Sequence, residues 1–149
     1  MRGACVLTDG EKFLICHAPN RKHGKHTWDL PKGHCNEREP YSTAALRELQ
    51  EETGLTLKDL NIVATCLTEE YEYGKGYISF LVISLEEIPA KELYCDSTFD
   101  TGDGTQLPEV NEYKWCDFCD LETKLYPKLS EIVPKMLIKY KKIWKRVEK

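Results

Sequence analysis

The segment from Pro40 to Thr53 is the strongest structural signal in this sequence. It consists largely of residues with high helix propensity, behind a proline suited to the first helical position. Gly54 follows it, and glycine readily adopts the left-handed conformation that ends a helix. The sequence therefore predicts a helix over 40–53.

Three glutamates share one face of this predicted helix. Glu48, Glu51 and Glu52 are three or four residues apart, or adjacent, so their side chains fall on one side. Neighbouring like charges cost on the order of 0.2–0.5 kcal/mol per pair unless cations or basic side chains neutralise them. Carboxylates are the ligands that Mg²⁺ or Mn²⁺ prefers, and such ions bridge carboxylates to substrate phosphates. Taken alone, three helical glutamates are more often a solvated surface, so their surroundings decide between the two interpretations.

Strand patterns surround the helix. Two apolar runs, 2–8 and 12–17, flank Asp9-Gly10 and predict a hairpin. Two further runs, 61–72 and 77–85, predict a second hairpin, and 112–117 predicts another strand. A short strand is expected at 28–30, after a basic loop at 18–27 and before Pro31.

The remaining segments complete an α/β sandwich in a single domain spanning 1–149. Residues 86–111 show no sustained periodicity and are a candidate substrate lid. Residues 125–147 predict an amphipathic helix, in which Pro134 is a place where the helix could bend.

Composition narrows the class of protein. A net charge of −4 gives no general indication of nucleic-acid binding, and no apolar stretch is long enough for a membrane span or a signal peptide. Seven scattered cysteines, an odd number, favour a reducing compartment, so we expect a cytoplasmic protein. A monomer is the favoured state.

The residues before the helix give the glutamates their context. Gly33 is followed by Glu39 and then by the segment Arg47–Leu55, which reads REL-QEE-TGL. This spaced pattern over Gly33–Leu55 resembles the complete Nudix box, the catalytic motif of the Nudix hydrolases. A match over 23 residues is very specific, unlike a lone short motif.

The resemblance implies a fold, an activity and a set of metal ligands. Nudix proteins carry a loop-helix-loop motif on a mixed sheet between helices, and they hydrolyse nucleoside diphosphates linked to another group. Glu51 and Glu52 match the main metal ligands, Glu48 a further ligand or base, and the Gly33 carbonyl a backbone ligand. The implied cofactor is Mg²⁺ or Mn²⁺.

The resemblance also suggests supporting residues and a general base. Glu39 and Arg47 match positions that brace the loop against the helix, although an ordinary surface ion pair is the alternative. The base often lies just before the last strand, where Glu109 and Glu112 are candidates. Pro108-Glu109 resembles the arrangement in bacterial RNA pyrophosphohydrolases, so we prefer Glu109 for contact with the metal or the attacking water.

Substrate contacts are expected around the box. Lys32 is suited to hold a phosphate, or is a solvated lysine on a turn. Tyr71, Tyr73 and Tyr77 could stack on a base, although cross-strand packing explains them equally well. The run Trp28–His34 resembles the segment that enters the box in diadenosine polyphosphate hydrolases.

These features rank the substrates. A dinucleoside polyphosphate or the 5′-triphosphate end of RNA comes first, because of that entry segment and the basic stretches at 21–26 and 135–149. Removal of oxidised nucleoside triphosphates is the alternative within enzymes. A non-catalytic nucleotide- or RNA-binding module is the alternative outside enzymes, and the intact glutamates argue against it.

Overall fold

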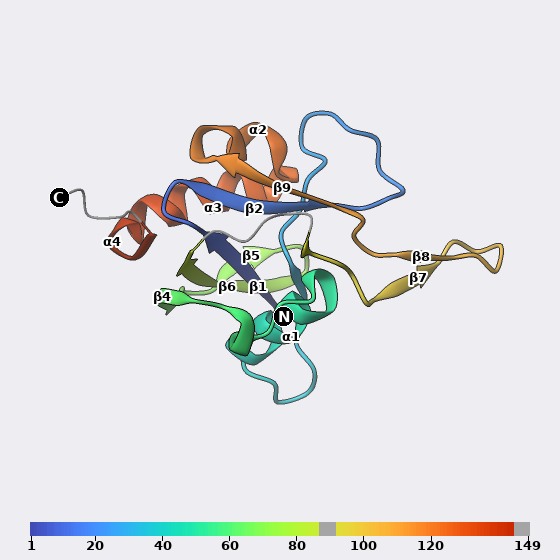
Figure 1. Cartoon of the computed structure of the whole chain (residues 1–149), viewed down its shortest axis with the longest axis horizontal. Coiled ribbons are helices and arrows are strands. Elements are labelled where there is room, and N and C mark those ends of the chain that lie inside the picture. The colour runs from blue at the N-terminus through green and yellow to red at the C-terminus, as the bar shows by residue number, and fades with distance from the viewer. Residues whose placement is uncertain (87–91, 145–149) are drawn as a thin grey trace.

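A mixed β-sheet separates two helical layers in the computed structural model, which describes residues 1–86 and 92–144 (Figure 1). The sheet consists of β1 (Arg2–Thr8), β2 (Lys12–His17), β3 (Lys32–His34), β4 (Ile62–Leu67), β5 (Tyr71–Tyr73), β6 (Gly76–Leu85) and β9 (Glu112–Asp117). The helices are α1 (Tyr41–Thr53), α2 (Leu121–Lys124), α3 (Pro127–Lys139) and α4 (Lys141–Trp144), with single 3₁₀ turns at Leu57–Asp59 and Phe118–Asp120. This architecture confirms the predicted α/β sandwich with a mixed sheet.

The order β4-β6-β1-β2-β9 places β1 in the middle of the sheet, where it runs parallel to β6 and antiparallel to β2. The predicted first hairpin is present. Its turn is stabilised by the Asp9 carboxylate, which accepts hydrogen bonds from the backbone N–H groups of Glu11 (2.8 Å) and Lys12 (2.7 Å). Gly10 adopts a φ of 99°, which explains the glycine.

The two strands of this hairpin pair only near the turn and then diverge. The segment from Asp29 to His34 fills the space between them: Asp29 bridges to Cys16 in β2, and β3 pairs antiparallel with the start of β1. The strand expected at 28–30 is thus reduced to isolated bridges, and the regular strand lies just beyond Pro31. This insertion brings the start of the Nudix box into the centre of the sheet.

The helices cover opposite faces of the sheet (Figure 1). On one face, α1 buries Ala45 and Leu49 against β1, β2 and β6. On the other, α3 buries the apolar stripe that the sequence indicated, which consists of Leu129, Val133, Met136 and Leu137. Burial of such side chains contributes about 1.5–3 kcal/mol each, so both layers fix the position of the central strands.

The second predicted hairpin is interrupted. The expected strand 61–72 is divided into β4 and β5, because Thr68 between them is buried and its hydroxyl accepts a hydrogen bond from the Phe80 N–H (2.9 Å). The Ser79 hydroxyl in turn donates to the Thr68 carbonyl (2.7 Å). The Thr68 N–H also donates to the Phe80 carbonyl (3.0 Å), so side-chain and backbone hydrogen bonds together hold the break against β6.

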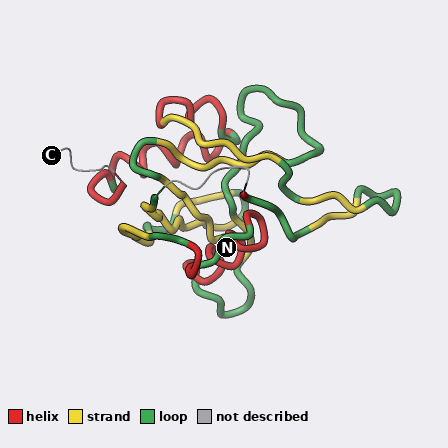
Figure 2. The backbone as a smooth tube through the Cα atoms, in the orientation of Figure 1, coloured by secondary structure: helices red, strands yellow, loops and turns green. Residues whose placement is uncertain are grey.

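Residues 92–111 contain structure that the sequence pattern did not reveal. A two-stranded hairpin of β7 (Thr98–Asp100) and β8 (Gln106–Pro108) projects from the body of the molecule (Figure 2). The expected loop over 86–111 is therefore wrong for this part, while 87–91 lie outside the described residues. The strands are short and largely exposed, which explains their weak hydrophobic pattern.

The C-terminal helix differs from the single helix expected over 125–147. Leu125 and Tyr126 precede α3, Pro134 lies within it, and the chain breaks at Tyr140 before α4. The Trp144 indole N–H donates to the Leu137 carbonyl (2.6 Å) and satisfies an oxygen that the break leaves without a helical partner. Residues 145–147 of the predicted helix lie outside the described part of the chain.

Within 1–86 and 92–144, no helix combines the length and apolar character needed to cross a bilayer.

Candidate active site

Helix α1 carries the three glutamates and ends as the sequence predicts. Pro40 directly precedes the helix, one residue earlier than expected, and its carbonyl accepts the first helical hydrogen bond from the Ala44 N–H (3.0 Å). Gly54 has a φ of 79°, and its N–H closes the last turn on the Gln50 carbonyl (2.8 Å). Ala44 and Ala45 are fully buried, so the small side chains of this face let the helix approach β1 closely.

Glu52 is the most buried of the three glutamates, with 5% of its surface exposed. One carboxyl oxygen accepts a hydrogen bond from the Lys32 backbone N–H (2.8 Å). Burial, and next the nearby Asp29 carboxylate, raise the pKa of Glu52 to about 9. Without a bound cation this acid is therefore neutral at pH 7.

Glu48 lies against the strand that enters the box. Its carboxylate occupies the space beside Gly33, where an added β-carbon would come within 2.0 Å of Oε1. Burial raises the pKa of Glu48, and the charges of Glu51 and Glu109 add to this effect while Arg47 opposes it. Gly33 is thus the residue type that leaves room for this carboxylate.

Arg47 connects the loop of the box to its helix. Its guanidinium donates to both carboxylate oxygens of Glu39 (3.0 and 2.9 Å), and also to the His34 carbonyl (2.8 Å). The Nη1 atom of Arg47 lies 2.9 Å from Oε1 of Glu48 and 3.5 Å from Oε1 of Glu51. The hydrogen bonds from Arg47 lower the pKa of Glu39 to about 2. This planar fork orients two elements at once, which a lysine could not do.

Glu51 is the most accessible of the box glutamates, with 41% of its side chain exposed. Its backbone carbonyl accepts a hydrogen bond from the Asp96 N–H (2.7 Å), which ties the end of α1 to the segment before β7. The carboxylates of Glu48, Glu51 and Glu52 do not form a group whose ligand atoms all lie within 4.8 Å of one another in the described residues. The three acids lie on one helix face but are not drawn together.

The two candidates for the general base have different surroundings. Glu109 is exposed, its backbone N–H donates to the Ser97 carbonyl (3.0 Å), and its charge is close enough to raise the pKa of Glu48. Glu112 instead contacts His23, with 2.6 Å between its Oε1 and the imidazole Nε2. Glu109 is thus a candidate whose charge acts on a box glutamate.

The proposed substrate-binding lysine has a partner that the sequence pattern did not reveal. The Lys32 ammonium lies 3.0 Å from the Asp29 carboxylate, and both side chains are largely buried. Burial alone would lower the pKa of Lys32, but Asp29 outweighs it and raises this pKa. Asp29 and Lys32 are three residues apart, which was the available signal for the pair.

The tyrosines do not form one stacking surface. Tyr71 and Tyr73 pair with Ile78 and Gly76, and both pack against the core on the α3 side. Tyr77 pairs with Glu72 on the opposite face of the hairpin and is 44% exposed. The Arg2 guanidinium lies 5.1 Å from the centre of the Tyr73 ring.

A second residue missed by the sequence pattern is Tyr113 in β9. Its hydroxyl donates a hydrogen bond to the backbone carbonyl of Glu52. This contact links β9 to the last turn of α1. The alternation of β9 directs Tyr113 toward α1, on the same face as its partner Cys16.

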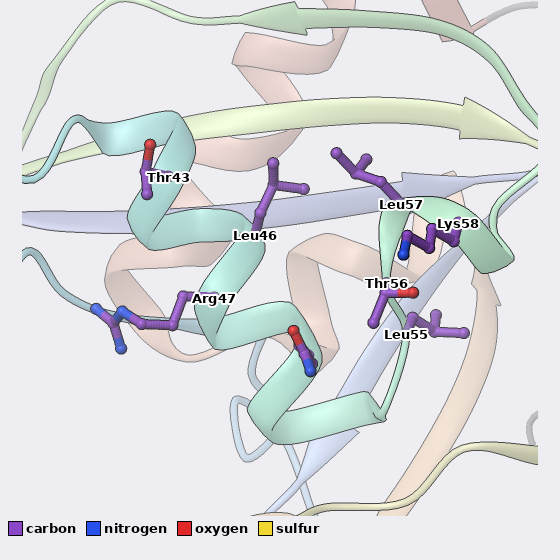
Figure 3. A pocket seen from close by; sticks show the side chains of 8 residues that line it. Thr43, Leu46, Arg47, Leu55, Thr56, Leu57 and Lys58 are labelled. Atoms are coloured by element: carbon purple, nitrogen blue, oxygen red, sulfur yellow. The ribbon is translucent and has the colours of Figure 1, made fainter.

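A pocket near the site belongs to the outer surface of α1 (Figure 3). It is lined by Thr43, Leu46, Arg47, Gln50, Leu55, Thr56, Leu57 and Lys58. None of these residues is acidic, and Figure 3 shows the leucines gathered on the side away from the Arg47 guanidinium. We therefore place the candidate site at the glutamates rather than in this pocket.

Comparison with known proteins identifies the family that this geometry defines. The model of the NUDIX domain matches residues 2–136, so the chain belongs to the Nudix family, and the family indicated by the box is confirmed. Proteins of this family generally use divalent metal ions.

Individual relatives agree with this assignment. The chain is 47% identical over 70 residues to an RNA pyrophosphohydrolase of Photobacterium profundum, in an alignment that covers 40% of each protein. It is 26% identical over 149 residues to an RNA pyrophosphohydrolase of Pelagibacter ubique, covering 91% of this chain and 90% of the relative. Alignments with several curated relatives span only 26% to 40% of those proteins' lengths.

Solved structures support the same fold. A C. elegans Ap4A hydrolase in a binary complex superposes with a TM-score of 0.63 at 23% identity, covering 95% of this chain and 96% of the other. At this identity the likeness concerns the fold alone.

Proposed function

We propose that this chain hydrolyses a phosphoanhydride bond in a nucleotide substrate, using Mg²⁺ or Mn²⁺ bound by Glu48, Glu51 and Glu52 with the Gly33 carbonyl. The supporting observation is the buried Glu52 carboxyl, whose pKa is raised to about 9. A buried acid beside a second carboxyl is unfavourable as an anion until a cation compensates it. The ligand atoms are hard carboxylate and carbonyl oxygens, and they stand at the positions that match the metal ligands of the Nudix box. The site therefore fits Mg²⁺ or Mn²⁺.

Each protein group has a defined task in this proposal. When bound, the cations neutralise charge on the phosphate oxygens and make the phosphorus easier to attack. Arg47 holds Glu48 in place through its contact at 2.9 Å and fixes the loop through Glu39. Glu109 accepts the proton of the attacking water, or joins the cation ligands, from its position near Glu48.

Substrate contacts are proposed on the side of β3 that faces Tyr73. The Lys32 ammonium is close enough to Tyr73 to oppose the burial that raises the pKa of this tyrosine, and Lys32 is held by Asp29 at 3.0 Å. A lysine oriented in this way is suited to a phosphate oxygen. Because Tyr77 lies on the opposite face of the hairpin, a single base can stack on Tyr73 or on Tyr77 but not on both.

The substrate class follows from the relatives and the entry segment. Relatives named RNA pyrophosphohydrolase favour the 5′-triphosphate end of RNA. The segment Trp28–His34 favours dinucleoside polyphosphates, which we rank together with RNA as the leading substrates. Removal of oxidised nucleoside triphosphates is the alternative activity. A binding module without turnover is the alternative class, which requires ligand binding in the absence of metal.

A comparison of kcat/KM values distinguishes these substrates. The purified chain is offered 5′-triphosphorylated RNA, diadenosine tetraphosphate and nucleoside triphosphates with Mg²⁺ or Mn²⁺, and kcat/KM is measured for each. We expect the RNA or the dinucleotide to exceed the triphosphates, and a steep fall in binding with salt would favour RNA. Equal or greater turnover of nucleoside triphosphates would contradict this ranking and favour the alternative activity. Tight metal-independent binding without products would contradict the hydrolase proposal and favour the binding module.

A further inference from the structure

A second group of metal-ligating side chains lies where β2 ends and β9 begins. His17 is the last residue of β2 and pairs with Glu112, the first residue of β9. His23, in the loop after β2, contacts both residues: its ring stacks on His17, and its Nε2 lies beside the Glu112 carboxylate. One ligand atom from each residue lies within 4.8 Å of the others.

This group faces away from the α1 glutamates. Phe13, Ile15 and His17 alternate along β2, and Phe13 and Ile15 point into the core beneath α3. His17 therefore points to the α3 face, whereas α1 covers the other face. The cluster thus shares neither a residue nor a sheet face with the α1 glutamates, whereas the proposed substrate contacts Lys32 and Tyr73 lie on the α3 face as well.

His17 has an unsatisfied nitrogen. It is 2% exposed, and its Nε2 is buried without a hydrogen-bond partner among the described residues. A buried polar atom in this state costs free energy unless something binds it, so such atoms are rare in folded proteins. Trp28 closes one side of the imidazole, with ring centroids 5.1 Å apart, and leaves His23 and Glu112 beside it.

The other two side chains can move to complete a coordination shell. The His23 ring stacks on His17 at 4.2 Å with planes 3° apart, so in this arrangement the two lone pairs do not converge on one point. His23 and Glu112 are 62% and 47% exposed, and both can rotate while His17 stays fixed. Two ligands of a tetrahedral zinc ion lie about 3.3 Å apart, and His23 Nε2 already lies 2.6 Å from Glu112 Oε1.

We propose that His17, His23 and Glu112 bind a transition-metal ion, with Zn²⁺ as the best match, at a site distinct from the box glutamates. Two imidazoles and one carboxylate form a ligand set that favours Zn²⁺ over Mg²⁺. Three protein ligands leave one position open. Lys25, Lys114 and Lys124 line the adjacent hollow, so an anion is the expected fourth ligand.

Zinc titration of the full chain tests this site. Calorimetry with Zn²⁺ in excess Mg²⁺ compares the wild type with His23→Gln and Glu112→Gln, both at exposed side chains. His34→Gln is the matched control, because it removes an exposed imidazole outside the cluster. Glu52→Gln separates any Zn²⁺ bound at the box from Zn²⁺ bound at the cluster.

We expect about one equivalent of Zn²⁺ to bind to the wild type, to His34→Gln and to Glu52→Gln. His23→Gln and Glu112→Gln should each weaken it by at least about tenfold. Nitrogen NMR of the wild type avoids mutation of buried His17, and Zn²⁺ should shift the imidazole resonances of both His17 and His23. Zinc binding unchanged by the two cluster variants, or lost only in Glu52→Gln, or an unshifted His17 imidazole would overturn the proposal.

Discussion

The Glu48 carboxylate occupies the space that a side chain on Gly33 would need. An added β-carbon would lie 2.0 Å from Oε1 and 2.2 Å from the carboxyl carbon. The glycine of the box is thus explained by a close approach between strand and helix, and both residues belong to the proposed metal site.

Gly33→Ala should impair metal binding with little effect on folding, because the displaced group is the end of a flexible side chain. We expect metal affinity and turnover to fall by about 10–100-fold. Calorimetry and a thermal melt measure the two effects. Gly24→Ala is the control, since nothing lies within 4 Å of its added β-carbon. Full metal affinity in Gly33→Ala would contradict the assignment.

Arg47→Lys should lower turnover by about 10–100-fold, although the positive charge is kept. A lysine cannot donate simultaneously to both oxygens of Glu39 and to the His34 carbonyl. Steady-state kinetics measure the loss. Removal of the exposed pair Lys128–Glu131 by Lys128→Met should leave kinetics unchanged. If Arg47→Lys behaved like Lys128→Met, Arg47 would be an ordinary surface residue.

Metal binding should release a proton from Glu52. Its pKa is about 9 without metal, so the acid is protonated at pH 7 and must ionise to bind a cation. Metal affinity should therefore rise with pH up to about 9, by at most about tenfold per unit. Calorimetry in buffers of different ionisation enthalpy counts the proton. Glu52→Gln should abolish this release, and an affinity independent of pH in the wild type would argue against the raised pKa.

The same shift gives the metal-free protein a stability that depends on pH. The folded pKa of Glu52 lies above its ordinary value of 4.5, so between these values the folded state holds a proton that the unfolded state has lost. Stability from this group is present below pH 4.5 and decreases as the pH rises toward 9. Denaturant unfolding across this range should show the decrease, and saturating Mg²⁺ should reduce it. An increase with pH that Glu52→Gln leaves unchanged would assign the dependence to other groups.

Glu109→Gln should reduce kcat by about 10²–10⁴-fold if Glu109 accepts the proton of the attacking water. A loss confined to metal affinity would instead assign it as a ligand. Glu122→Gln, at an exposed acid on α2, is the control. A Glu109→Gln variant with full turnover and full metal affinity would remove this residue from the site.

Local sequence signals predicted the parts of the structure that depend on neighbouring residues. The Asp9-Gly10 turn, the end of α1 at Gly54 and the bounds of β9 are examples. The glutamate face of α1 follows from helical periodicity in the same way, and the spacing of the box identified the family.

Features that depend on distant contacts were not predictable. The break between β4 and β5 requires the Thr68 hydroxyl to meet Phe80 across the sheet. The cluster of His17, His23 and Glu112 requires the register of β2 against β9, and these residues are far apart in sequence. A period of two or 3.6 residues carries no information about such pairings.

The most direct test of the central claim compares the wild type with Glu52→Gln in a product assay with Mg²⁺ or Mn²⁺. Glutamine keeps an oxygen that can accept the Lys32 N–H, so the variant should fold and still bind nucleotide. We predict metal-dependent cleavage of diadenosine tetraphosphate or 5′-triphosphorylated RNA by the wild type, and loss of that cleavage in the folded variant. Undiminished cleavage by Glu52→Gln, or nucleotide binding without any product from the wild type, would contradict a hydrolase that works through the α1 glutamates.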